Sequence, residues 1–289
     1  MKSRQLQAAG LRWRCLEAGE GPPLVLLHGF PEDARSFDRV LPALPGLRLI
    51  APDLKGYGET DKPRPGGPNG DYRPSRMADE LAALLDVLAA EAGVQQLDVV
   101  GHDWGGILLS ALVARHPRLV RRAVLLNAPV VRFVPWRPVH VYAFNLPWLP
   151  EAAFARDPRA FVRGILRWWT AVDEAFTEED VARYAEALSG GSIRCALAYY
   201  RGLPRDLPFI VDAWRSLRTR PAPPTLIIWG ARDPILPLAV GRMGAEDLRA
   251  RLAVIPAAGH FVHREAPAEV ARLILEHLEV SPSRRGTRP

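Results

Sequence analysis

The chain has 289 residues, of which 48% are hydrophobic and 24% charged, and its formal net charge of +6 comes almost entirely from arginine. These arginines are scattered, with no zinc-ligand spacing or RNA-binding motif, so we expect no nucleic-acid partner. No apolar stretch is long enough to span a bilayer, and the polar first residues do not resemble a signal peptide, so we expect a cytoplasmic protein without a membrane partner.

Short apolar runs alternate with helical patterns along most of the chain. One helix is predicted around residues 77–88, with Ser75 as its N-cap and Gly93 at its end. A second helix ends at His116, and a third spans Ala266 to Leu278. The alternation predicts an α/β fold, with a mostly parallel sheet flanked by helices. The predicted buried strands are Leu24–Leu27, Leu47–Ala51, Leu97–Val100, Ala123–Leu126, Leu226–Trp229 and Leu252–Ile255.

The alternation stops between residues 129 and 220, where aromatic-rich helical pieces replace the strand-like runs. We predict a helical cap inserted into one core, above the carboxyl ends of the strands, where open α/β sheets bind their ligands. The core then comprises residues 1–128 and 221–280, and the cap residues 129–220. Residues 281–289 are predicted to be a disordered tail. The sequence leaves the oligomeric state open.

An aspartate stands at a predicted sharp turn of the core. The segment Gly101-His102-Asp103-Trp104-Gly105-Gly106 follows a predicted strand and precedes a helix-like stretch. This is the strand–turn–helix context of a nucleophile elbow. A carboxylate at such a point attacks saturated carbon and forms an alkyl ester, whereas a serine is acylated. Asp103 therefore predicts substrates such as epoxides or alkyl halides.

Several motifs make the chain similar to the α/β-hydrolase fold and, within it, to the epoxide hydrolases, over roughly residues 8–279. The resemblance implies an α/β-hydrolase fold with an inserted cap, and a reaction that needs no metal ion and no organic cofactor. The motifs are His28-Gly29-Phe30-Pro31, Asp53-Leu54-Lys55-Gly56-Tyr57-Gly58, the elbow at Asp103, and two later segments that contain Asp233 and His260.

The resemblance also implies a catalytic triad of Asp103, His260 and Asp233. His260 would be the general base that activates water to hydrolyse the ester, and Asp233 would orient its ring. Related enzymes can carry the acid after the preceding strand, but that position is Asn127 here, which favours Asp233. We interpret His263, three residues beyond His260, as a surface or packing residue.

Backbone and cap groups complete the implied site. The backbone N–H groups of Phe30 and Trp104 would form the oxyanion hole. Two cap tyrosines usually donate to the epoxide oxygen in this family. Tyr200 matches one of them and His140 takes the place of the other, with Tyr142 as the alternative if the register differs by two residues. The candidates for the substrate pocket are Tyr142, Trp148 and Phe261.

The sequence thus predicts an epoxide hydrolase that converts a small apolar epoxide and water into a vicinal diol through a covalent intermediate on Asp103. The alternative is a haloalkane-type dehalogenase with the same triad, although many such enzymes carry asparagine where this chain has Phe30. A non-catalytic binding module that reuses the fold is a third possibility, and the complete triad argues against it. The natural substrate and the stereochemistry stay open.

Overall fold

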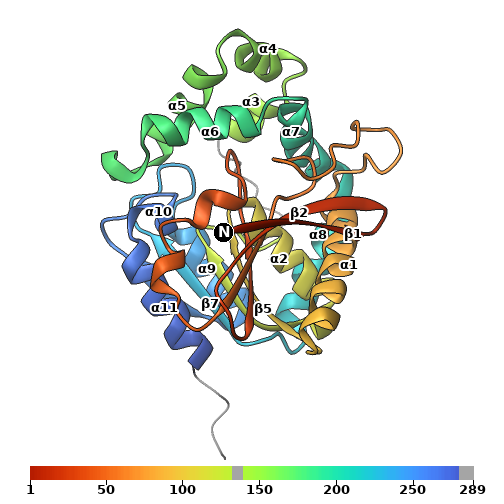
Figure 1. Ribbon diagram of the computed structural model, residues 1–289, viewed down its shortest axis with the longest axis vertical. Helices are drawn as coiled ribbons and strands as arrows, with labels where there is room; N and C mark the ends of the chain where they lie inside the picture. Colours follow the sequence, from red (N-terminus) through yellow and green to blue (C-terminus); the bar gives the residue numbers. More distant parts are fainter. Residues whose placement is uncertain (132–138, 280–289) are drawn as a thin grey trace, which may run out of the picture.

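The computed structural model describes residues 1–131 and 139–279, and the predicted tail 281–289 lies outside the described residues. One eight-stranded sheet forms the centre, and helices cover both of its faces (Figure 1). The strands run in the order β1-β2-β4-β3-β5-β6-β7-β8. Their bounds are β1 Lys2–Ala8, β2 Leu11–Ala18, β3 Pro23–Leu27, β4 Arg48–Pro52, β5 Leu97–His102, β6 Val120–Leu126, β7 Thr225–Gly230 and β8 Arg251–Ile255.

The six predicted strands correspond to β3–β8, which pair in parallel. This confirms the predicted α/β class. Strands β1 and β2, which were not predicted, add an antiparallel hairpin at one edge. The side chains of β1 are mostly polar and exposed, so this strand contains no apolar run that a search for buried strands would detect.

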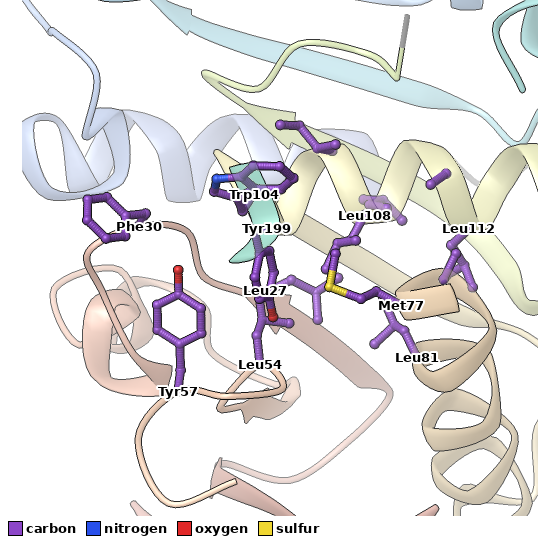
Figure 2. Packing of buried hydrophobic residues seen from close by; sticks show 14 of the residues in the cluster. Leu27, Phe30, Leu54, Tyr57, Met77, Leu81, Trp104, Leu108, Leu112 and Tyr199 are labelled. Carbon is purple, nitrogen blue, oxygen red and sulfur yellow. The ribbon is translucent and has the colours of Figure 1, made fainter. Parts of the chain in front are cut away.

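Helices bury both faces of the sheet, and alternate side chains of each strand point to opposite faces. On one face, Leu27 of β3 shares a cluster with the helix residues Met77 and Leu108 (Figure 2). On the other face, Leu26 shares a second cluster with the helix residue Val270. The helices are α1 Pro74–Ala92, α2 Trp104–Arg115, α3 Val139–Asn145, α4 Leu149–Arg156, α5 Pro158–Trp169, α6 Glu178–Ala187, α7 Ser192–Gly202, α8 Leu207–Thr219, α9 Leu238–Leu248, α10 Val262–Glu265 and α11 Pro267–Glu279.

The start of α1 differs from the prediction. Arg73 occupies the N-cap position and the helix begins at Pro74, so Ser75 lies inside the first turn. The backbone N–H and the hydroxyl of Ser75 both donate to Asp206, at 2.7 and 2.9 Å. Asp206 is 131 residues away in sequence, so a local pattern could not indicate this contact. The predicted end is confirmed, because Gly93 adopts a left-handed conformation with φ of 66°.

Helices α3–α7 lie above the sheet as a cap (Figure 1). Helix α8, which the sequence analysis assigned to the cap, packs against α2 and α9. Helix α8 therefore lies with the core. Among the described helices, none has the length and apolar character needed to cross a membrane.

Candidate active site

Asp103 occupies the turn between β5 and α2, and its backbone is in an unusual conformation with φ of 48° and ψ of −116°. The turn is possible because its neighbours lack side chains. A Cβ atom on Gly105 would lie 2.2 Å from the carbonyl oxygen of Leu27, and one on Gly29 would lie 2.4 Å from the Cβ of Asp103. Such a strained turn holds one side chain at the carboxyl end of the sheet, as a nucleophile elbow requires.

The two carboxylate oxygens of Asp103 have different neighbours. Oδ1 accepts a hydrogen bond from the backbone N–H of Phe30 at 2.8 Å, whereas Oδ2 lies 3.7 Å from Nε2 of His260. Burial alone would raise the pKa of Asp103, but the facing His260 outweighs it and the pKa lies below its usual range. The carboxylate is therefore ionised at neutral pH, with Oδ1 fixed and Oδ2 free of any closer bond among the described residues.

His260 lies between two carboxylates. Its Nδ1 is 2.8 Å from Oδ2 of Asp233, and its Nε2 faces Asp103. Burial opposes the charged form of the ring, but the negative charges of Asp233 and Asp103 raise the pKa of His260 to about 10. The resting site therefore holds a protonated ring between two carboxylates.

Asp233 is anchored by three donors besides the histidine. Its Oδ1 accepts from the backbone N–H groups of Ile235 and Leu236, at 2.9 and 2.8 Å, and its Oδ2 accepts from the amide of Asn127 at 2.8 Å. The amide oxygen of Asn127 in turn accepts from the N–H of Gly230 at 2.8 Å. Asn127, at the competing acid position, thus supports Asp233 in place of supplying a carboxylate itself.

His263 is completely buried, so of the two interpretations, surface or packing residue, the structure favours the packing residue, and its ring also binds Glu32. Glu32 lies 3.0 Å from Nε2 of His263 and 2.8 Å from Nδ1 of His102. The other ring nitrogen of His102 lies 3.0 Å from the carbonyl oxygen of His260. These three side chains are close enough to share a metal ion, but direct contacts between them already join the loops that carry Phe30, Asp103 and His260.

The cap places a layer of aromatic rings over the elbow. Tyr200 of α7 packs edge-on against Trp104, with 5.0 Å between ring centroids. The ring centroid of His140 of α3 lies 5.9 Å from that of Tyr200 and 4.9 Å from that of Trp169 at the end of α5. Trp169 in turn packs edge-on against His260 at 5.3 Å. The structure therefore brings Tyr200 and His140, the two predicted cap donors, to the same region as Trp104 and His260.

Several buried polar atoms have no hydrogen-bond partner within residues 1–131 and 139–279, and four of them belong to the aromatic layer or to His260. These four are the hydroxyl of Tyr200, Nδ1 of His140, Nε1 of Trp169 and Nε2 of His260. Burial and the charge of Asp103 raise the pKa of Tyr200 well above its usual value, so its hydroxyl keeps its proton. Burial lowers the pKa of His140 to about 4, so this ring is neutral at physiological pH. Unpaired buried polar groups are costly, and their concentration here indicates a site for a polar ligand.

The pocket candidates separate into two groups. Phe261 is fully buried beside His260, with 5.1 Å between the rings. Tyr142 and Trp148 are 59% and 73% exposed, and the structure does not place them in the buried aromatic layer. Tyr142 is two positions from His140 on α3, so it points to nearly the opposite side of the helix. The structure therefore favours His140 over Tyr142 as the second cap donor.

Two residues next to the triad were missed by the sequence analysis as site residues. Trp169 joins the layer described above, and its carbonyl oxygen accepts from the N–H of His260 at 3.1 Å. The carboxylate of Glu265 accepts from the N–H groups of Gly259, Phe261 and Ala171, at 2.8 to 3.0 Å. Both act across contacts between the cap and the histidine loop, so no local sequence signal indicates them.

Comparison with known proteins agrees with the observed α/β fold. A family model for the α/β-hydrolase fold matches residues 22–267. The AB hydrolase superfamily protein YfhM of Bacillus subtilis is 29% identical, over 96% of this chain and 98% of its own length. Epoxide hydrolase A of Mycobacterium tuberculosis is 27% identical, over 95% and 96%. Among solved structures, the epoxide hydrolase VrEH1 from Vigna radiata superposes with a TM-score of 0.83 at 26% identity, covering 96% of this chain and 97% of its own.

Proposed function

The chain belongs to the α/β-hydrolase fold family, and from that premise we propose that it hydrolyses small apolar epoxides to vicinal diols through an ester on Asp103. Similarity to proteins named epoxide hydrolases supports the reaction class. The observation that carries the proposal is the arrangement of Asp103, whose Oδ1 is held by Phe30 while Oδ2 faces His260 at 3.7 Å. A carboxylate held in this way can attack carbon.

In the first step, Oδ2 of Asp103 forms a bond to one epoxide carbon while the bond from that carbon to the ring oxygen breaks. Tyr200 and His140 hydrogen-bond to the ring oxygen as its negative charge develops. The resulting alkoxide takes a proton through the Tyr200 hydroxyl, and the protonated His260 ring makes up the loss. At the start, the charges of Asp233 and Asp103 both raise the pKa of His260, but formation of the ester removes the charge of Asp103. The pKa of His260 falls as a result, and the ring can release its proton.

In the second step, neutral His260 takes a proton from water as the water oxygen attacks the ester carbon of Asp103. The negative charge of the tetrahedral intermediate develops on Oδ1, where the Phe30 N–H already points. The N–H of Trp104 belongs to the first turn of α2 and would be the second donor. As the intermediate collapses, the diol leaves with the former Oδ2 and takes the proton from His260. The carboxylic acid of Asp103 then returns its proton to His260, which restores the resting ion pair.

Isotope labelling of Asp103 tests this proposal. A single turnover in water enriched in oxygen-18 should place the label in the Asp103 peptide, while the diol formed in that turnover carries none. With His260→Gln, the ester should accumulate and add the mass of the epoxide to the protein, because no base activates water. Solvent label that enters the first diol directly would contradict the covalent route. Halide release from a bromoalkane without diol from any epoxide would favour the dehalogenase alternative.

A further inference from the structure

Trp169 carries a buried hydrogen-bond donor that the proposed reaction does not use. Of the four buried polar atoms described above, the reaction assigns roles to the Tyr200 hydroxyl, the His140 ring and Nε2 of His260. Only Nε1 of Trp169 is left without a role, and it finds no partner in the described part of the chain. Trp169 is 1% exposed, so bulk water does not surround this N–H.

The indole of Trp169 is held in place on several sides. Its ring lies 4.9 Å from the ring of His140 and 5.3 Å from that of His260, and it stacks on Phe261 at 6.3 Å. Its backbone carbonyl accepts from the N–H of His260, which fixes the end of α5 against the histidine loop. The side chain therefore cannot turn away to find another partner without disturbing the triad.

The chemistry of this group limits what it can bind. An indole N–H donates a hydrogen bond and cannot accept one, so its partner is an acceptor such as an ether, hydroxyl or carbonyl oxygen. The neighbours of the ring give its place in the site. The indole of Trp169 contacts the rings of His140 and His260, and it lies 6.1 Å from the ring of Phe30, between ring centroids. The ring that carries this donor therefore lies among the residues that surround Asp103.

We propose that Trp169 is a specificity-determining residue, and that among small, otherwise apolar epoxides the site prefers those with a hydrogen-bond acceptor close to the ring, which Nε1 of Trp169 binds. The inference rests on the proposed function and names its substrate class. A site that hydrogen-bonds a substrate oxygen discriminates against the analogue without it, because its own polar group is then left unpaired. Plain alkyl epoxides are turned over by the same triad, but they leave this donor unpaired.

A pair of substrates of nearly equal shape tests the proposal. In ethyl glycidyl ether, an oxygen replaces one methylene of 1,2-epoxyhexane, two atoms from the ring. The quantity to measure is the ratio of kcat/KM for ethyl glycidyl ether to kcat/KM for 1,2-epoxyhexane. Trp169→Phe removes the N–H and keeps a ring, and it should lower this ratio three- to tenfold, the range of one ordinary hydrogen bond. Any general loss of packing or stability affects both substrates and cancels in the ratio. Trp168→Phe is the matched control, because this neighbour is 54% exposed, and it should leave the ratio unchanged.

The outcomes separate this proposal from the one on which it rests. An unchanged ratio in Trp169→Phe, with diol formed from both substrates, overturns the role of Trp169 and leaves the epoxide hydrolase proposal intact. No diol from either substrate in the unaltered protein contradicts the proposed function, and the inference falls with it. A second readout does not need a folded Trp169 variant. In Asp103→Asn protein with nitrogen-15 tryptophan, ethyl glycidyl ether should shift the indole N–H resonance of Trp169 further downfield than 1,2-epoxyhexane does. Equal shifts would overturn the proposal.

Discussion

At the scale of single residues, the site depends on which side chain faces Nδ1 of His260. Asp233 lies 2.8 Å from His260, and the amide of Asn127 lies 2.8 Å from the same Asp233 oxygen. The carboxyl ends of β6 and β7 are neighbours in the sheet, so both strands deliver a side chain to the same point. The side chain after β6 therefore contacts the same carboxylate oxygen that faces this histidine.

The first prediction concerns variants in which the side chains of Asp233 and Asn127 are exchanged. Asp233→Asn should lower the rate of ester hydrolysis by roughly 10⁴-fold, as loss of the acid does in serine triads, because the ring loses its charged partner. Adding Asn127→Asp to this variant should recover at least roughly tenfold of that loss, since a carboxylate then stands next to the same ring. Single-turnover rates of ester breakdown measure both effects. If the double variant is no faster than Asp233→Asn, the position after β6 cannot serve the histidine of this chain.

The second prediction concerns pH. The folded state raises the pKa of His260 to about 10, above the value near 6.5 expected in the unfolded chain. The stabilisation from its protonated ring is therefore complete below pH 6.5 and is lost as the pH rises through 10. The difference in Tm between the unaltered protein and His260→Gln should be large at pH 7 and shrink toward pH 10.5. A difference that stays constant over this range would show that the ring does not titrate there.

At the scale of secondary-structure elements, the histidine loop between β8 and α10 is tied to the cap as well as to the core. Glu265 at the end of α10 accepts from Gly259 and Phe261 on either side of His260, and from Ala171 after α5. Burial raises the pKa of Glu265 despite these donors. One carboxylate thus holds the His260 loop and the adjoining cap segment in a fixed relation.

Glu265→Gln is the third prediction. The amide keeps one acceptor oxygen but turns an NH₂ group toward backbone donors, so at least one N–H loses its partner. Hydrogen bonds to a charged group contribute about 1.5–3 kcal/mol each, and we expect a loss of that size in the free energy of unfolding. We also expect kcat to fall about tenfold, because a small misplacement of a catalytic group is costly. Glu269→Gln in the exposed first turn of α11 is the control and should change neither quantity. Equal effects of the two substitutions would contradict the role of Glu265.

Elements also show where sequence reasoning succeeds and where it stops. The strands β3–β8 and the turn at Asp103 follow from local patterns, because buried apolar runs and closely spaced glycines leave a signal within a few residues. The hairpin β1–β2 was missed because its exposed edge strand is polar. Glu32 and Trp169 were missed for a different reason, since each acts on a residue brought close only by the fold, and Glu265 does so through its bond to Ala171. Asp206 at Ser75 is a further case of this kind.

At the scale of the whole molecule, the cap is joined to the core by a cluster of charges as well as by aromatic packing. Asp180 and Arg183 come from the cap helix α6, and Asp38 and Arg264 come from the core. Arg264 pairs with Asp38 and lies 2.9 Å from Asp180, and Arg183 lies 3.0 Å from Asp38 and 2.6 Å from Asp180. The side chain of Arg264 is 1% exposed, so its charge depends on these two acids. The cluster fixes α6 above the loop that carries His260.

The last prediction removes the buried member of this cluster. Arg264→Ala removes one of the cations that pair with Asp180 and Asp38, and breaking a buried ion pair from one side costs about 3–5 kcal/mol. We place the result toward the lower end of that range, because Asp38 is partly exposed and Arg183 continues to neutralise both acids. Since Arg264 connects α10 to α6, hydrogen exchange should quicken in α6 more than in the strands β3–β7. Arg163→Ala is the matched control, because its exposed pair with Glu178 joins two cap helices without touching the core, and it should leave exchange in α6 nearly unchanged. If both substitutions loosen α6 equally, the attachment of the cap does not depend on the buried charges, and the aromatic layer over Asp103 carries it alone.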